Sequence, residues 1–279
     1  MTRRSILSAS AAVALARPIL ADQTAPAKGR VKQSACRWCY QKISLDDLCR
    51  AGAEMGLSAI DLVSPEDAPT LKKYGLVPSM IMPGGGDIPD GFNRRENHDK
   101  LEAQLRERIP KAAAVGAPNI ITFSGNRRGM SDQEGLENTV IGLNRVKKIG
   151  EDHGVTICLE LLNSKVDHHD YMCDHTKWGA EVIRRVDSPR VKLLYDIYHM
   201  QIMEGDIIRT IRDNIDCIAH FHTGGVPGRH ELDDSQELQW RTVAKAIADL
   251  KFQGYMAHEF VPTRDPLTSL HEAVRLCTV

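Results

Sequence analysis

The segment TICLELLN at residues 156–163 is short and apolar, and it carries Glu160 near its downstream end. Apolar runs of this length are typical of strands buried on both faces of a parallel sheet. Three further segments of the same kind follow, separated by stretches with helical periodicity: VKLLYDIYH (191–199), CIAHFHTGG (217–225) and GYMAHEFVP (254–262). Strands that alternate with helices predict an α/β fold with a parallel sheet.

The upstream half of the chain repeats this alternation. Its four predicted strands are QSACRWCY (33–40), SAIDLV (58–63), LVPSMIMP (76–83) and NIITFSGN (119–126). Helices are expected from Ser44, from Ser64, and over residues 96–115, 131–154, 176–187, 204–214, 235–251 and 266–277. A (β/α)8 barrel takes about 250 residues. We therefore predict one TIM barrel, a (β/α)8 domain, over residues 31–279.

Each of the last four predicted strands bears one polar side chain near its downstream end: Glu160, Asp196, His222 and Glu259. In a closed barrel the downstream ends of all strands meet at one mouth, where barrel enzymes keep their chemistry. Three carboxylates and one imidazole favour a single divalent ion, Mn²⁺ or Mg²⁺, with Zn²⁺ or Co²⁺ also possible. We expect these four residues to bind it, with two of the carboxylates left free to move protons.

Two candidate substrate contacts follow the sixth and seventh predicted strands. His199 comes three residues after Asp196, just past the strand, and is either a donor to substrate or a loop histidine bonded to backbone. Arg229 lies in the turn GGVPGRHE (224–231) and offers a planar fork for a carboxylate or hydroxyls. Its alternative is a surface ion pair with Glu231.

Two more candidates lie after the fifth and first strands. Asn163 follows Glu160 by three residues and is expected to orient that carboxylate or to meet the substrate. Trp38, with Tyr40, is either an apolar wall for the face of a sugar or part of the core. Cys36 and Cys39 form a CxxC pair, but no second pair follows, so a zinc or redox site is not favoured.

The first 27 residues are predicted to precede the fold as a twin-arginine export signal. TRRSIL (2–7) places two arginines before the weakly apolar SASAAVALA (8–16), and small-residue cleavage sites follow. The expected location is therefore periplasmic or exported. An ordinary basic start on a cytoplasmic protein is the alternative.

Composition restricts the partners. The 279 residues carry 36 basic and 37 acidic side chains, a net charge of −1, which gives no bulk attraction to nucleic acid or to an anionic membrane. We expect a small-molecule substrate, no nucleic acid and no membrane once the signal is removed; assembly into a homo-oligomer is left open.

Two blocks, YDIYHMQIMEGD (195–206) and VPGRHE (226–231), resemble the hydroxypyruvate isomerase family of the xylose isomerase-like barrels. The resemblance covers nearly all of the chain after the signal and is strongest from 156 to 262. It implies one metal ion held by Glu160, Asp196, His222 and Glu259, the two glutamates exchanging the substrate proton, and His199 and Arg229 contacting substrate. His222 departs from that family, whose members have glutamine there, and agrees with ketose epimerases.

The function that this resemblance implies is isomerisation, by way of an enediolate, of a small hydroxy-keto acid or sugar. An exported lyase of 3-keto-glycosides, or a sugar epimerase, would use the same metal site. A non-catalytic sugar binder and a nuclease of the same barrel type are further alternatives. The charge balance, and the few metal ligands on the second and third strands, count against the nuclease.

Overall fold

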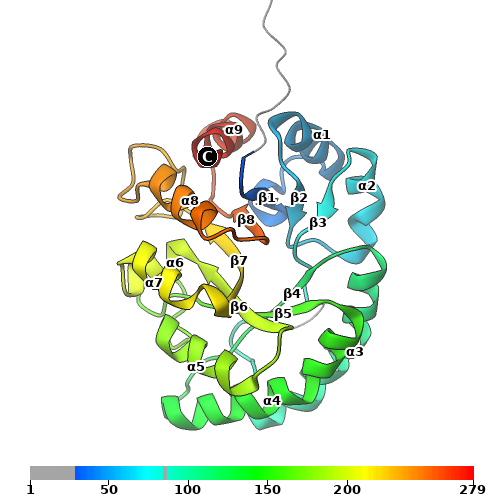
Figure 1. The fold of residues 1–279 in the computed structure, drawn as a ribbon, viewed down its shortest axis with the longest axis vertical. Coiled ribbons are helices and arrows are strands. Elements are labelled where there is room, and N and C mark those ends of the chain that lie inside the picture. The colour runs from blue at the N-terminus through cyan, green and yellow to red at the C-terminus, as the bar shows by residue number, and fades with distance from the viewer. Residues whose placement is uncertain (1–28, 84–86) are drawn as a thin grey trace, which may run out of the picture.

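The computed structural model describes residues 29–83 and 87–279, which form one ring of parallel strands surrounded by helices (Figure 1). Eight strands form the sheet in the order β3-β2-β1-β8-β7-β6-β5-β4. Their bounds are β1 Lys32–Cys36, β2 Ala59–Asp61, β3 Val77–Pro78, β4 Asn119–Thr122, β5 Thr156–Glu160, β6 Val191–Asp196, β7 Ile218–Thr223 and β8 Tyr255–His258.

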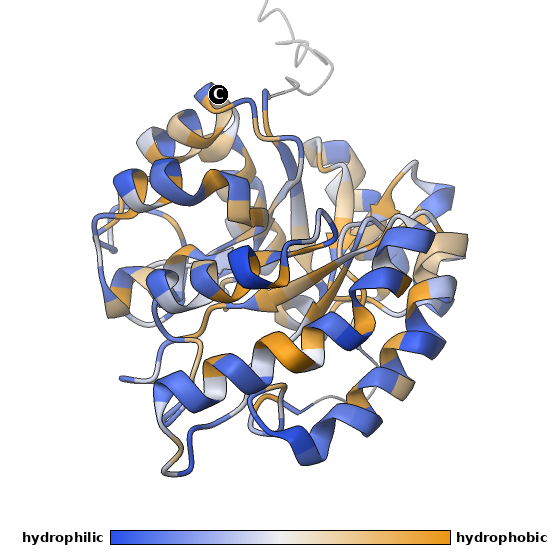
Figure 2. Cartoon of the chain, turned by 60° about the horizontal axis from the view of Figure 1, so that its bottom comes forward, coloured by the Kyte–Doolittle hydropathy of each residue, from blue (hydrophilic) through white to orange (hydrophobic). Residues whose placement is uncertain are grey.

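The helices lie outside the strands, as Figure 1 shows. They are α1 Leu45–Met55, α2 Ala68–Lys73, α3 His98–Ala114, α4 Asp132–His153, α5 Thr176–Val186, α6 Ile197–Met203, α7 Ile207–Asn214, α8 Trp240–Asp249 and α9 Pro266–Cys277. Short 3₁₀ turns occupy Arg37–Tyr40, Pro65–Asp67, Arg95–Asn97 and Ile215–Cys217. Figure 2 shows hydrophobic strands at the centre and helices with both hydrophobic and hydrophilic residues, as expected for amphipathic helices that cover a barrel.

The two edges of the sheet, β3 and β4, are joined by Ile81. Its amide donates to the carbonyl of Asn119 at 2.9 Å, and its carbonyl accepts from the amide of Ile121 at 3.1 Å. On the other side, β1 pairs in parallel with β8. The sheet therefore closes on itself, and the prediction of a single (β/α)8 barrel is confirmed.

The structure corrects several of the predicted element boundaries; the third strand, for example, is limited to Val77–Pro78. The sixth strand ends at Asp196, and residues 197–199, which the apolar run VKLLYDIYH predicts to lie in or just after that strand, begin the helix α6. The first strand ends at Cys36, and a 3₁₀ turn takes up the rest of QSACRWCY. The helix expected over 235–251 is shorter and runs from Trp240 to Asp249.

The predicted export signal at residues 1–27 lies outside the described residues. Within the described ranges, no helix combines the length and the apolar character needed to cross a bilayer. The elements of the barrel begin at Lys32 and end at Cys277.

Closure at Ile81 gives a stability prediction. Ile81 is fully buried at the seam between β3 and β4. Its replacement by alanine is expected to lower the free energy of unfolding by about 2–5 kcal/mol, because the cavity cannot be refilled. The matched control is Ile141→Ala, since Ile141 is 41% exposed on α4, and its expected effect is below about 0.5 kcal/mol. Urea denaturation measures both, and equal losses would contradict the closure described above.

Candidate metal centre

Four polar side chains meet at the downstream end of the barrel, one from each of the last four strands. Glu160 and Asp196 are the final residues of β5 and β6, His222 is next to last in β7, and Glu259 directly follows β8. All four residues are buried, and one ligand atom from each lies within 4.8 Å of the others. The structure thus brings together the four residues that the sequence analysis predicts as metal ligands.

His222 presents its Nδ1 atom to the carboxylates. The distance from Nδ1 is 2.7 Å to Glu259 Oε2, 3.4 Å to Glu160 Oε1 and 4.0 Å to Asp196 Oδ2. Although it is buried and close to these oxygens, Nδ1 makes no hydrogen bond. A buried nitrogen without a hydrogen-bond partner, facing three carboxylates, is suited to ligate a cation.

The carboxylates differ in their protonation. Burial raises the pKa of Asp196 to about 8, and the neighbouring Glu259 and Glu160 add to the rise. Burial also raises the pKa of Glu160. Burial acts in the same direction on Glu259, but Arg229 and His222 outweigh it and hold the pKa of Glu259 below its usual value. The site therefore combines one firmly ionised glutamate with two carboxyl groups that burial drives toward the neutral form.

These residues fit a divalent cation. If all three were ionised, the buried carboxylates would carry more negative charge than the adjacent Arg229 can offset, and uncompensated buried charge is costly. Oxygen donors with one imidazole nitrogen suit Mn²⁺ or Mg²⁺, and also accept Zn²⁺ or Co²⁺. Glu160, Asp196, Glu259 and Nδ1 of His222 are the groups that would hold such an ion.

Arg229 is not at the surface and lies against these four residues, hereafter the quartet: Glu160, Asp196, His222 and Glu259. Its Nη2 donates to Glu259 Oε2 at 2.5 Å and to Asp196 Oδ2 at 3.3 Å. The guanidinium lies 5.3 Å from the ring centre of Trp38 and 5.2 Å from that of Tyr198, distances at which cation–π attraction operates. Its backbone has φ 58°, a left-handed conformation uncommon for residues other than glycine.

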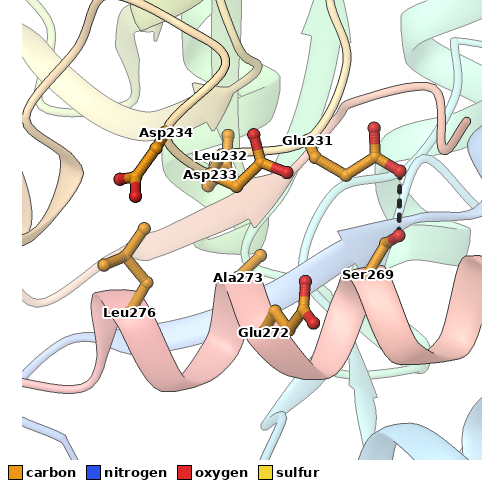
Figure 3. A pocket seen from close by; sticks show the side chains of 8 residues that line it. All are labelled: Glu231, Leu232, Asp233, Asp234, Ser269, Glu272, Ala273 and Leu276. Carbon is orange, nitrogen blue, oxygen red and sulfur yellow. Dashed lines mark hydrogen bonds between the residues drawn. The ribbon is translucent and has the colours of Figure 1, made fainter. Parts of the chain in front are cut away.

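The alternative pairing of Arg229 with Glu231 is wrong. Glu231 accepts from Thr263 and from Ser269 Oγ, the latter at 2.8 Å, and this second bond is the dashed line in Figure 3. The pocket drawn there has a volume of about 250 Å³ and lies between the 231–234 segment and α9. None of its lining residues belongs to the quartet.

Trp38 and Tyr40 have different environments. Trp38 is 37% exposed, and its Nε1 donates to Glu259 Oε1 at 2.6 Å, so it forms part of the site. Tyr40 is buried and stacks edge-to-face on Phe260, so the core interpretation holds for Tyr40. Both Cys36 and Cys39 are free thiols with a pKa raised by burial, which gives no support for a reactive pair.

His199 and Asn163 lie behind the quartet. His199 is in the first turn of α6, is fully buried, and has its backbone amide capped by Asp196. Asn163 Nδ2 is 2.6 Å from Nδ1 of His199 and also donates to Asp167. Burial lowers the pKa of His199 well below its usual value. Neither residue lines the cavity beside the quartet, so their direct contact with substrate stays a prediction.

The cavity beside the quartet has a volume of about 380 Å³. Glu160 and Glu259 are the two quartet members that line it, together with Arg229, Trp38 and His168. The rest of its lining is apolar and comes mainly from the ends of β2 to β5. Its size is in the range of small-molecule sites.

Three buried polar side chains next to His222 were not assigned from the sequence: Cys36, Asp61 and His220. The sequence does contain a signal for two of them. Asp61 is a charge inside the apolar run SAIDLV, and His220 precedes His222 by two residues, which places both rings on one face of a strand.

Comparison with known proteins identifies the family of this barrel. The model of the xylose isomerase-like TIM barrel family matches residues 50–277. A putative hydroxypyruvate isomerase of Danio rerio is 30% identical over 230 residues, which cover 81% of this chain and 78% of that protein.

Two solved structures share the fold. An AP endonuclease, family 2, from Brucella melitensis superposes with a TM-score of 0.76 at 22% identity, covering 86% of this chain and 96% of that one. A 3-keto-D-glucoside 4-epimerase from E. coli has a TM-score of 0.72 at 19% identity, with 90% and 99% covered. With the family model matched over most of its length and its barrel closed, the chain belongs to the xylose isomerase-like TIM barrel family.

Proposed function

We propose that this protein is a metal-dependent isomerase or epimerase that moves a proton on a carbon next to a carbonyl group. The proposal rests on the fact that only two of the four quartet residues line the cavity. Glu160 and Glu259 face the cavity, whereas Asp196 and His222 do not line it. Two carboxyl groups at the cavity can remove and return a proton, and the other two residues serve only to hold an ion. The similarity to a putative hydroxypyruvate isomerase supports the same class of reaction.

Glu259 is the proposed base and Glu160 the proposed acid. Arg229 and His222 hold the pKa of Glu259 low, so it starts as a carboxylate that accepts the α-proton. Burial raises the pKa of Glu160, which favours its protonated form as a donor. A divalent ion bound at the quartet would supply Lewis-acid stabilisation of the negative charge that develops on the carbonyl oxygen. Trp38 and Arg229 fix both oxygens of Glu259 by hydrogen bonds and so orient it toward the cavity.

Exchange of the two glutamates for glutamine tests this scheme. Glu160→Gln and Glu259→Gln are each expected to lower kcat by about 10²–10⁴-fold, because glutamine cannot carry the proton. The measurement is deuterium incorporation into substrate in D₂O, with bound metal quantified in each variant. Glu237→Gln, at the protein surface, is the control and should leave the rate unchanged. A loss below about tenfold for either site variant with metal retained would contradict the two-glutamate scheme.

A second candidate, action on a sugar derivative larger than a three-carbon keto acid, is favoured by the cavity lining. Its apolar members are Leu62, Met82, Ile88, Ile121, Phe123 and Leu162. A small hydroxy-keto acid has little apolar surface to place against them, whereas the face of a sugar ring or an apolar aglycone does. The substrate of this candidate is a ketose or a 3-keto-glycoside. With a 3-keto-glycoside, loss of the α-proton is followed by departure of the group on the β-carbon, which leaves an unsaturated ketone.

Met82 separates the two candidates because it is 42% exposed at the cavity and not part of the quartet. With a ketose or 3-keto-glucoside as substrate, Met82→Ser is expected to raise KM by about 3–10-fold and to leave kcat nearly unchanged. With hydroxypyruvate as substrate, KM should not change. Ile141→Ser, on the exposed face of α4, is the matched control. Turnover of hydroxypyruvate alone, insensitive to Met82, would contradict the sugar candidate.

We also propose export by the twin-arginine route, which accepts folded proteins and so permits metal loading before transport. Arg3 and Arg4 carry this proposal. The double variant Arg3→Lys, Arg4→Lys is expected to remain in the cytoplasm of a bacterial host that has this route, as measured by cell fractionation. Arg17→Lys should be exported normally. Cytoplasmic retention of the unaltered chain would contradict the proposal.

A further inference from the structure

Asp61 is a fully buried carboxylate that lies outside the quartet yet contacts one of its members. It is the last residue of β2, and it reaches His222 of β7 across the interior of the barrel. A carboxylate removed from water is costly unless neighbouring groups donate hydrogen bonds or charge to it. The partners of Asp61 therefore indicate what the residue does.

Both oxygens of Asp61 are engaged. Oδ2 lies 2.9 Å from Nε2 of His222 and 3.5 Å from Sγ of Cys36, which donates to it. Oδ1 accepts from the hydroxyl of Ser79 and lies 3.1 Å from Nε2 of His220. All five side chains in this cluster are buried. Both oxygens of Asp61 thus lie against possible donor groups, and Asp61 is not among the residues that line the cavity.

We infer that Asp61 is a positioning residue that fixes His222 with its proton on Nε2 and its Nδ1 turned toward the quartet. An ionised carboxylate accepts hydrogen bonds and donates none, so the nitrogen that faces it has to carry hydrogen. When an ion is bound, the other ring nitrogen, 2.7 Å from Glu259 and 3.4 Å from Glu160, would present its lone pair to that ion. A histidine that ligates a metal commonly donates its second N–H to such a partner. This inference rests on the proposed metal-dependent function.

The backbone at this position is also constrained. Leu62, the residue after Asp61, has φ 52°, a conformation that a leucine rarely adopts. Strain of this kind persists where the surrounding structure over-determines it, often near functional sites. Leu62 lines the cavity, whereas Asp61 remains buried inside the barrel.

A competing role exists for the same cluster. Asp61, His220 and His222 each offer a ligand atom within 4.8 Å of one another, which is compatible with a second metal ion. In that case Nε2 of His222 would bear a metal instead of a proton. The two roles predict different numbers of bound ions per chain and a different group on Nε2 of His222, so experiment can distinguish them.

The principal test compares Mn²⁺ affinity of the full chain and of Asp61→Asn by isothermal titration calorimetry. Asparagine has nearly the same shape, but its amide can turn its NH₂ toward Nε2 and favour the wrong tautomer. The dissociation constant is expected to rise about 10–100-fold, as for other residues that support a metal ligand. Cys36→Ala is the matched control, because it removes the other neighbour of Nε2 and leaves the acceptor in place. Its dissociation constant should stay within about threefold of the unaltered protein.

Equal affinities for the unaltered chain and for Asp61→Asn, with one ion in each, would overturn this inference and leave the proposed function standing. Absence of any ion from the unaltered chain would overturn both. Two ions per chain, reduced to one by Asp61→Asn, would make Asp61 a ligand and would also overturn the positioning role.

A second measurement does not depend on the folding of the variant. Side-chain ¹⁵N shifts of His222 in the unaltered chain loaded with diamagnetic Zn²⁺ report which nitrogen carries hydrogen. A proton on Nε2 with Nδ1 bound to the ion supports the inference. An ion on Nε2, or a proton on Nδ1, would contradict it.

Discussion

Three carboxylates buried around one imidazole nitrogen are the constraint on which this site depends. Glu160, Asp196 and Glu259 come from separate strands, and no one of them is close to another in sequence. Like charges in a space of low polarity repel one another strongly, so the cluster requires positive charge to stay ionised. Arg229 supplies one such charge and reaches two of the three carboxylates. A divalent ion would supply the remainder and would lower the pKa values that burial has raised.

Closure of the barrel is what makes this cluster possible. Parallel strands place their downstream ends on one side, and closure brings β2 within reach of β7 across the interior. The polar side chains inside the barrel then form two layers. The quartet faces the cavity, and Asp61 with His220 lies against the far nitrogen of His222. In the proposed scheme the first layer binds the ion and moves the proton, and the second layer sets the orientation of His222.

Much of the fold and the four quartet residues could be predicted from the sequence, for a physical reason. Glu160 and Asp196 interrupt apolar strands near their downstream ends, and polar residues in such places are costly unless they serve a site. The start of α6 could not be located, because the apolar run after Asp196 reads equally well as strand or helix. The hydrogen-bond partners of Arg229 and Asp61 could not be predicted either, because these partners are distant from them in the sequence.

The most direct test of the account is anomalous X-ray diffraction from crystals of the manganese-loaded protein. One peak is expected, within bonding distance of Glu160, Asp196, Glu259 and Nδ1 of His222. A peak at another place, or none in the quartet despite bound manganese, would contradict the central claim that these four residues hold the ion.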